Sequence, residues 1–251
     1  MNKQDWIKKT QDWKNKWSVF LPEYNDDSKG INIYKFYEIL NQNLKEDSVI
    51  CWDAGSSLYC SNQALRLNGK GQRSLGSLAQ SEMGAAISMS CGISFAKNYG
   101  EVICVIGDGS FHTQVNALAI VKKFNLPINI FVLQNKGYLS IKNSMDKFYE
   151  GRRIGTDSND GYFFPQIRDI AYTYQINYIR IDKIKDFKQG FYLINKNIGP
   201  CICEVICPEL QEIIPCMMPK KDKDGNNLEM GLDQMYPWLS EEEYNSEMIK
   251  D

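Results

Sequence analysis

The sequence has a single histidine, His112, and no cluster of basic residues with aromatics between them. Its 29 Lys and Arg against 31 Asp and Glu leave a formal charge of −2, which argues against nucleic acid as a partner. No apolar run reaches the length that crosses a membrane, and the first residues do not have the pattern of a signal peptide. These absences argue against nucleic-acid and membrane partners.

The sequence also has no Cys-x-x-Cys pair, although it has eight cysteines. Cys104, Cys201 and Cys203 lie in strand-like runs, and Cys91 lies in a helical stretch of small residues, so we expect buried free thiols. Cys201-Ile-Cys203 does not have the spacing of a zinc or redox pair and is typical of alternation along a strand. The pattern predicts a reduced, cytoplasmic protein.

What the chain does have is a regular alternation of short apolar runs and amphipathic stretches. Helices are predicted over 33–44, 83–96, 111–124, a stretch ending at 172, and 186–195; strands are predicted over 48–53, 102–106, 128–133, 178–181 and 201–207. A further helix, then a loop rich in Gly and Ser, should follow the first strand. This order predicts an α/β fold, a doubly wound, mostly parallel sheet with helices on both faces.

The two ends of the chain differ from this central part, which we place at 30–216. Residues 1–29 are linker-like and polar, with Trp6, Trp13 and Trp17 on one helical face that should pack on the body or on another chain. Residues 217–251 form a polar, acidic tail. Two alternatives are open for Leu228–Tyr244: it orders over a ligand site, or it is a disordered arm.

Asp108 and Asn135 each follow a predicted buried strand and are separated by 27 residues, about one helical crossover. In open α/β sheets, ligands bind beyond the carboxyl ends of the strands. Four residues of the helix between them recur at helical spacing and should form the side that packs on the sheet: Ala117, Ile120, Val121 and Phe124. A carboxylate, an amide oxygen and a nearby carbonyl suit Mg²⁺, which usually completes its shell with waters and a diphosphate.

Two small-residue turns could receive such a diphosphate. Gly55-Ser56-Ser57 follows one predicted strand, and Gly109-Ser110 follows another and opens a helix. Backbone N–H groups and small hydroxyls suit phosphate oxygens. Either turn by itself is equally typical of an ordinary strand-to-helix connection.

At these residues the sequence resembles the thiamine diphosphate enzymes of the acetolactate synthase and pyruvate decarboxylase superfamily. The matching motifs are Gly107-Asp108-Gly109-Ser110 and Gln134-Asn135-Lys136-Gly137. The resemblance implies the diphosphate-binding domain of such an enzyme, with thiamine diphosphate and Mg²⁺ as cofactors. It implies that Asp108, Asn135 and the carbonyl of Gly137 or of a neighbour bind the metal. Gln134 departs from the family, which usually has Asn there.

The same resemblance implies roles for further residues. The segment equivalent to Asp53–Ser57 and the Gly109-Ser110 pair contact the diphosphate, while Tyr138 and Leu139 line the cofactor. Met83, in Glu82-Met83-Gly84, matches the apolar residue beneath the bridge between the two cofactor rings. The alternative for Met83 is a core methionine.

His112 stands where the resembled family more often has Gln. A lone imidazole beside a cofactor can move protons near neutral pH, so His112 is a candidate catalytic residue. The alternative is a histidine at a helix N-terminus without a chemical role.

In the resembled enzymes, a Glu from a separate pyrimidine-binding domain activates the cofactor across a subunit interface, and no Glu here matches that motif. The resemblance therefore implies half of an active site, in a lyase or transferase acting on a small 2-keto acid and inactive alone. We expect the carboxyl-terminal part of a longer enzyme or one subunit of a split one, in a homo- or hetero-oligomer.

Three other functions are alternatives to this interpretation. One is a non-catalytic cofactor-binding or assembly subunit, and another is a subunit of a split sulfopyruvate or phosphonopyruvate decarboxylase-type enzyme. The third, a subunit of a ferredoxin-linked oxidoreductase, is disfavoured because no Cys-x-x-Cys set could hold an iron–sulfur cluster.

Overall fold

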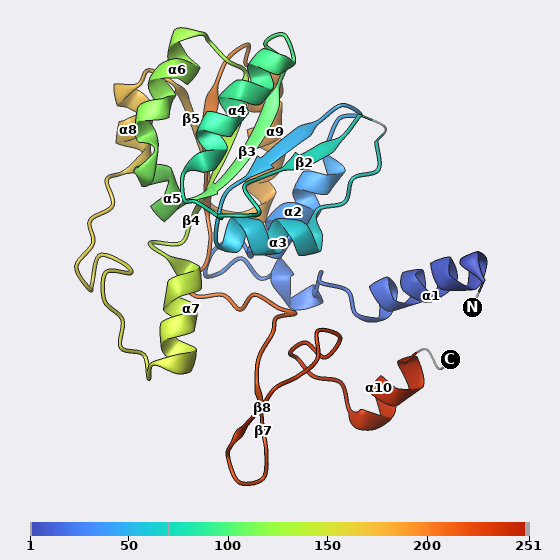
Figure 1. The fold of residues 1–251 in the computed structure, drawn as a ribbon. Coiled ribbons are helices and arrows are strands. Elements are labelled where there is room, and N and C mark those ends of the chain that lie inside the picture. Colours follow the sequence, from blue (N-terminus) through green and yellow to red (C-terminus); the bar gives the residue numbers. More distant parts are fainter. Residues whose placement is uncertain (1, 70, 249–251) are drawn as a thin grey trace. The chain divides into compact units, whose positions relative to one another are not determined.

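The structure is a computed structural model that describes residues 2–69 and 71–248. The chain divides into two compact units, Met1–Gln211 and Glu212–Asp251. The first, the N-terminal unit, contains one six-stranded sheet in the order β2-β1-β3-β4-β6-β5, in which every pairing is parallel (Figure 1). Its strands are β1 (Val49–Trp52), β2 (Arg73–Leu75), β3 (Val102–Gly107), β4 (Ile128–Gln134), β5 (Asn177–Ile181) and β6 (Cys201–Ile206).

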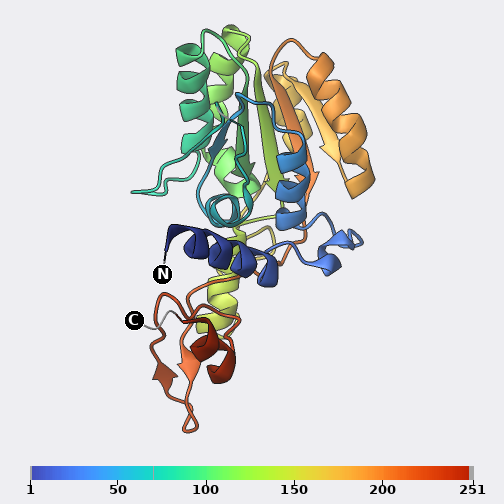
Figure 2. The same ribbon diagram turned by 90° about the vertical axis from the view of Figure 1, so that its right-hand side faces the viewer.

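Helices cover both faces of this sheet. They are α2 (Ile33–Gln42), α3 (Ser56–Ala64), α4 (Ala85–Ala96), α5 (Asp108–Thr113), α6 (Leu118–Lys123), α8 (Ile167–Thr173) and α9 (Phe187–Lys196). Helix α7 (Leu139–Phe148) lies instead beyond one end of the sheet (Figure 1). Figure 2 shows α4 and α6 on one side of the sheet and α2 and α9 on the other. The predicted doubly wound α/β fold is confirmed.

An apolar core lies on each face of the sheet, between the strands and the helices that cover them. On one face, side chains of α4, α6 and α8 pack on β1, β3 and β4 in a single apolar cluster. On the other face, Phe36 of α2 contacts Phe131 of β4 and Phe187 of α9, with ring centroids 5.4 and 6.1 Å away. Strands buried on both faces read as continuous apolar runs, which is why β3 and β4 were readily predicted.

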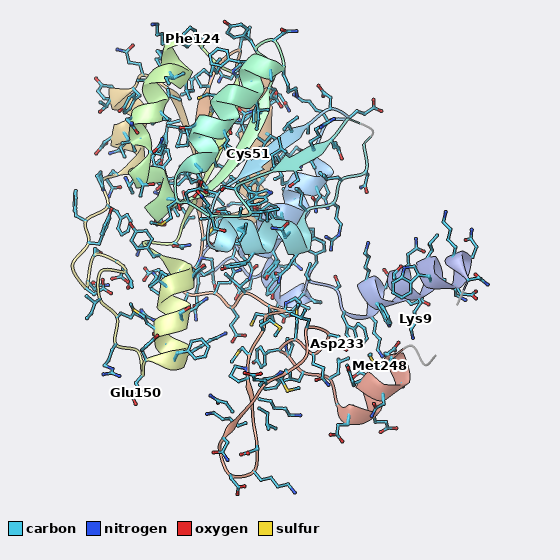
Figure 3. The ribbon with its side chains drawn as sticks, viewed as in Figure 1. Lys9, Cys51, Phe124, Glu150, Asp233 and Met248 are labelled. Atoms are coloured by element: carbon cyan, nitrogen blue, oxygen red, sulfur yellow. The ribbon has the colours of Figure 1, made fainter. Side chains whose placement is uncertain are left out.

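The single helix predicted over 111–124 is wrong. The chain forms α5, a 3₁₀ turn over Val115–Ala117, and then α6. The turn changes the phase of the helix, so Ala117 and Val121 are buried while Ile120 and Phe124 are 46% and 42% exposed. Phe124 lies at the outer end of the body, whereas Cys51 lies inside it (Figure 3).

Among the strands and α-helices of the N-terminal unit, β2 and α7 were not predicted. The edge strand β2 lies in the segment expected to be a loop; it is three residues long and all three are exposed, so no apolar pattern marks it. Helix α7 buries only Leu139 and Lys142, which leaves little helical periodicity in the sequence. Both omissions concern elements whose burial pattern is weak.

The N-terminal helix α1 (Lys3–Lys16) forms as the tryptophan spacing predicts. The Trp6 and Trp13 rings meet edge to face at 5.8 Å, and Trp13 stacks on Trp17 at 6.3 Å. No residue of α1 is buried, so the helix does not bury its indoles in the body. The alternative, packing on another chain, stays a prediction.

Seven of the cysteines are buried free thiols: Cys51, Cys60, Cys91, Cys104, Cys201, Cys203 and Cys207. Burial raises the pKa of Cys51 and of Cys60 to about 12, which keeps these groups in the unreactive thiol form. Within residues 2–69 and 71–248, no helix has both the length and the apolar character needed to cross a membrane.

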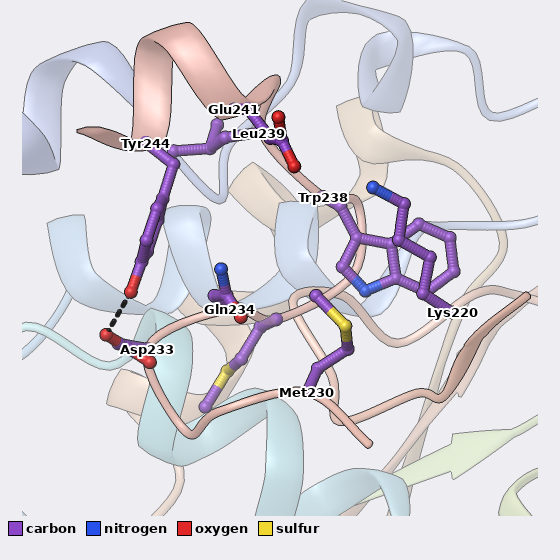
Figure 4. Close-up of a pocket in the computed structure, with 9 residues that line it drawn as sticks. Lys220, Met230, Asp233, Gln234, Trp238, Leu239, Glu241 and Tyr244 are labelled. Carbon is purple, nitrogen blue, oxygen red and sulfur yellow. Dashed lines mark hydrogen bonds between the residues drawn. The ribbon is translucent and has the colours of Figure 1, made fainter. Parts of the chain in front are cut away.

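The second unit, Glu212–Asp251, has regular structure of its own. It contains the two-stranded hairpin of β7 (Lys220–Lys221) and β8 (Asn227–Leu228) and the helix α10 (Glu241–Glu247), capped by Ser240. A cavity of about 100 Å³ lies within it, bordered by Trp238 and Tyr244; the Tyr244 hydroxyl donates to Asp233 at 2.6 Å (Figure 4). The described part of this segment thus has local regular structure, and both alternatives for Leu228–Tyr244, ordering over a ligand site or a disordered arm, stay predictions.

Candidate functional site

The candidate site lies at the carboxyl ends of β1, β3 and β4, which are neighbours in the sheet. Gly107 and Leu133 are partners in the β3–β4 register, so both strands end at the same level. Asp108 follows Gly107, and Asn135 comes two residues after Leu133. The fold therefore brings together the pair that the sequence predicted, and both side chains are buried.

The Asp108 carboxylate connects the two strand ends. Its Oδ1 accepts the Gly109 N–H at 2.8 Å and its Oδ2 accepts the Gly137 N–H at 3.0 Å. Burial raises the pKa of Asp108 to about 7, and the amide bonds and the Lys142 ammonium oppose that shift. A buried carboxylate whose pKa is so strongly raised, at the end of a parallel strand, marks a candidate functional site.

Several buried polar atoms near this edge have no hydrogen-bond partner in the described structure. They are Asn135 Oδ1, Ser57 Oγ, Ser140 Oγ and His112 Nε2. Unsatisfied buried polar atoms are costly, so their gathering indicates a place built for a polar ligand. Across the described residues no three His, Cys, Asp or Glu side chains form a metal cluster. The available donors are instead one carboxylate, one amide oxygen and main-chain carbonyls, a set that fits Mg²⁺.

The turn at Gly55-Ser56-Ser57 faces the start of α7. A side-chain carbon added at Gly55 would lie 3.4 Å from Ser140 Oγ, an ordinary contact distance, so the two segments are neighbours, and glycine is favoured there by its φ of +69°. Ser56 and Ser57 are both buried at the first turn of α3. Their main-chain N–H groups and hydroxyls suit phosphate oxygens, as the sequence predicts.

The residues 135–138, which we call the Asn135 loop, contain the predicted third metal ligand. The Gly137 carbonyl accepts the Leu139 N–H at 3.1 Å, and the Leu139 side chain is buried beneath. Gly137 has φ +143°, and a side chain there would place a carbon 2.2 Å from the Thr156 carbonyl oxygen. Only glycine fits at this position.

Gly109 and Ser110 open α5 beside Tyr138. A carbon added at Gly109 would lie 2.3 Å from the Tyr138 ring, so the ring lies directly on the glycine. Ser110 is buried, and its carbonyl accepts the Thr113 hydroxyl at 2.7 Å. The structure thus places these three predicted residues in one compact group.

The main chain next to Met83 is held by Asp53, the residue that follows β1. The Asp53 carboxylate accepts the N–H groups of Gly84 and Ala86, both at 3.0 Å, and so caps α4. Gly84 has φ +88° and lies against α5, where an added carbon would be 2.5 Å from the Thr113 hydroxyl. Met83 itself is 49% exposed, so the alternative of a core methionine is wrong.

His112 packs among aromatic rings on α5. Its ring lies 5.8 Å from Phe111 and 5.5 Å from Phe164, and Phe164 also contacts Tyr138. Burial lowers the pKa of His112, which favours the neutral imidazole. A neutral ring with one unpartnered nitrogen can accept or donate one hydrogen bond, and its catalytic role stays a prediction.

Sequence reasoning missed Ser140, Lys142 and Asp157. Ser140 and Lys142 come from α7, and Asp157 lies in a polar loop. The one hint in the sequence was Lys142 itself, a charged residue that directly follows the mainly apolar stretch Tyr-Leu-Ser-Ile. Ser140 lies opposite Gly55, which is far away in the chain, whereas Lys142 and Asp157 contact each other across the end of α7.

Fold and site together define an α/β protein with a candidate polar ligand site at the carboxyl ends of neighbouring parallel strands. The family model for the thiamine pyrophosphate enzyme C-terminal TPP binding domain matches residues 53–205. The chain belongs to this family.

Curated relatives agree with this assignment. The chain is 25% identical over 230 residues to the acetolactate synthase large subunit of Cyanidium caldarium, an alignment covering 91% of this chain and 37% of the relative. It is 28% identical over 149 residues to the chloroplastic acetolactate synthase 1 of Zea mays, covering 58% and 23%. It is also 28% identical over 141 residues to the chloroplastic acetolactate synthase of Arabidopsis thaliana, covering 55% and 21%. The chain thus spans well under half the length of these relatives.

Proposed function

We propose that this chain is the diphosphate- and Mg²⁺-binding module of a thiamine diphosphate-dependent 2-keto acid decarboxylase or carboligase. It would need a pyrimidine-binding domain, from a partner subunit or from a longer chain, and small 2-keto acids would be its substrates. The observation that carries the proposal is the Asp108 carboxylate beside the buried, unpartnered Asn135 Oδ1 at adjacent strand ends. The similarity to acetolactate synthases supports the reaction class.

In this proposal each residue has a binding task. Asp108 and Asn135 would hold Mg²⁺ with a carbonyl at Gly137, while the turns at Ser56-Ser57 and Gly109-Ser110 would hold the diphosphate. When bound, thiamine diphosphate supplies a nucleophilic carbon and a sink for the electrons left when CO₂ departs from a 2-keto acid. The half-exposed Met83 lies where an apolar side chain can support the cofactor.

The surrounding residues would exclude water and keep the diphosphate end rigid. The Tyr138 ring covers Gly109, and Phe164 covers both Tyr138 and His112. Asp108 is held by two amides before any ligand arrives, so little rearrangement is needed on binding. The neutral His112 could exchange a proton or a hydrogen bond with substrate.

Calorimetry with the whole chain tests the binding function. Thiamine diphosphate should bind when Mg²⁺ is present and not when EDTA removes it, and thiamine without its diphosphate should not bind. Asp108→Ala should abolish the Mg²⁺-dependent signal. If the variant bound thiamine diphosphate as the wild-type chain does, the site assignment would be wrong.

Turnover tests the catalytic function. The chain with a pyrimidine-domain partner should release CO₂ from pyruvate or another small 2-keto acid, and the chain alone should not. Tight Mg²⁺-dependent binding without turnover in the reconstituted pair would instead favour a non-catalytic cofactor-binding or assembly subunit.

A further inference from the structure

A lysine is fully buried next to the candidate site. The Lys142 side chain is 1% exposed, although a lysine ammonium is costly to remove from water unless it is paired. Its Nζ lies 3.3 Å from the Asn135 carbonyl oxygen and 3.5 Å from that of Lys136. The Asp157 carboxylate lies 3.7 Å away. The binding function proposed above uses none of these contacts.

These contacts connect three consecutive segments of the chain. Lys142 lies on α7, the two carbonyls belong to the Asn135 loop, and Asp157 belongs to the polar loop before α8. The polar loop is also joined to the Asn135 loop directly, because the Tyr138 N–H donates to the Thr156 carbonyl at 2.9 Å. Asp157 further accepts the Asn159 N–H at 2.9 Å, which shapes its own turn. Lys142 therefore lies at the junction of all three segments.

The contacts of Lys142 affect which main-chain carbonyls of the Asn135 loop could bind a metal. The Asn135 and Lys136 carbonyls accept hydrogen bonds from the ammonium, while the Gly137 carbonyl accepts the Leu139 N–H at 3.1 Å and keeps a second lone pair that a metal could use. The same contacts fix the main chain from which the Asn135 amide projects. The Oδ1 of that amide is buried and has no hydrogen-bond partner in the described structure.

We propose that Lys142 is a positioning residue that holds the Asn135 loop in its metal-binding conformation through two carbonyls and Asp157. The inference rests on the proposed Mg²⁺- and diphosphate-binding function. It assigns the buried ammonium a task that no surface lysine could perform, since water would compete for its hydrogen bonds.

A rival effect has the opposite sign. As a positive charge near the site, Lys142 repels Mg²⁺, so removing the charge alone would strengthen metal binding. As a positioning group, Lys142 supports the ligands, and its removal weakens metal binding. Groups that orient metal ligands typically contribute 10- to 100-fold in metal affinity. The direction of the change therefore distinguishes the two effects.

The experiment compares the whole chain with Lys142→Met and Lys142→Arg. Mg²⁺ affinity is measured by calorimetry in the presence of thiamine diphosphate, and amide hydrogen exchange is measured at Gly137 and Tyr138 without ligands. The matched control is Lys183→Met, because Lys183 also donates to a carbonyl, that of Asp27 at 2.7 Å, and pairs with the Asp27 carboxylate at 3.5 Å. Thermal unfolding checks that each variant folds.

We expect Lys142→Met to weaken Mg²⁺ binding about 10- to 100-fold and to speed exchange of both amides at least about tenfold. Lys142→Arg should recover most of the affinity, and Lys183→Met should match the wild-type chain. Unchanged or tighter Mg²⁺ binding by a folded Lys142→Met variant overturns the proposal.

Two further outcomes are also decisive. If Lys142→Met does not fold, Asp157→Asn replaces it: weaker Mg²⁺ binding and faster exchange support the proposal, and wild-type behaviour overturns it. If the wild-type chain shows no Mg²⁺-dependent binding, the proposed function fails. Amide exchange in the Lys142 variants then decides by itself whether this lysine orders the Asn135 loop.

Discussion

The main-chain N–H of Gly137 donates a 3.0 Å hydrogen bond to Oδ2 of Asp108, joining the loop after β4 to the end of β3. The bond is buried, and it occupies one of the two carboxylate oxygens of Asp108 as an acceptor. It places the Asn135 loop beside the carboxylate before any metal arrives. Consequences for stability, for pH dependence and for ligand binding follow from this contact and from its neighbours.

Gly137→Ala should destabilise the protein strongly. Its φ is +143° and the added carbon would lie 2.2 Å from the Thr156 carbonyl oxygen, so strain and a steric clash combine to cost about 3 kcal/mol. Gly155→Ala is the matched control, with φ +66° and nothing within 4 Å, and should cost about 1 kcal/mol. Urea unfolding of both variants gives the comparison; equal losses would show that the Thr156 contact does not restrict Gly137.

The stability of the metal-free protein should depend on the ionisation of Asp108. Its pKa is about 7 in the folded state against 3.8 ordinarily, so between these values the folded chain holds a proton that the unfolded chain has lost. The contribution of Asp108 to stability is therefore present at low pH and is lost as pH rises from about 4 to 7. The slope is at most about 1.4 kcal/mol per pH unit.

The measurement is the difference in unfolding free energy between the wild-type chain and Asp108→Asn, followed from pH 4 to 8 in EDTA. As pH rises, the unfolding free energy of the wild-type chain should fall relative to that of Asp108→Asn, and the difference should level off above about pH 7. A difference that stays constant, or that moves in favour of the wild-type chain, would contradict the raised pKa.

Mg²⁺ binding should show the complementary pH dependence. A proton and Mg²⁺ compete for the Asp108 carboxylate, so apparent Mg²⁺ affinity should fall up to about tenfold for each pH unit below about 7. Calorimetry with thiamine diphosphate at fixed ionic strength measures it, in buffers of different ionisation enthalpy that also report proton release. Affinity independent of pH between 5.5 and 7 would exclude Asp108 as the titrating ligand.

Met83→Ala should separate ligand binding from stability. Because Met83 is 49% exposed, its truncation should change the unfolding free energy by less than about 1 kcal/mol. Ile87→Ala, a fully buried position in the same segment, should cost about 3 kcal/mol. In the reconstituted enzyme Met83→Ala should lower turnover while Mg²⁺-dependent diphosphate binding is kept. Normal turnover would remove Met83 from the cofactor site.

Much of the fold could be predicted from the sequence because its central strands are buried on both faces. β3 and β4 are short apolar runs with a polar residue after each, and their order with the helices specifies a parallel sheet. The weak points were elements without such a pattern. β2 is exposed throughout, and the break between α5 and α6 occurs at the unremarkable residue Gln114.

The candidate site divides in the same way. Asp108, Asn135 and the glycines around them carry a local motif, and the fold brings them together as expected. Lys142, Ser140 and Asp157 carry no such motif. Their positions depend on how α7 and the polar loop pack on the strand ends, which is a long-range property.

By itself the sequence determined the parallel α/β fold class, the family resemblance and the pair of metal-ligand candidates, since these depend on local pattern and spacing. Only the tertiary structure decided that Met83 is exposed, that Ile120 and Phe124 face outward, and that a lysine is buried against the Asn135 loop. The physical reason is that burial and hydrogen bonding across distant segments are set by packing, which no single stretch of residues specifies.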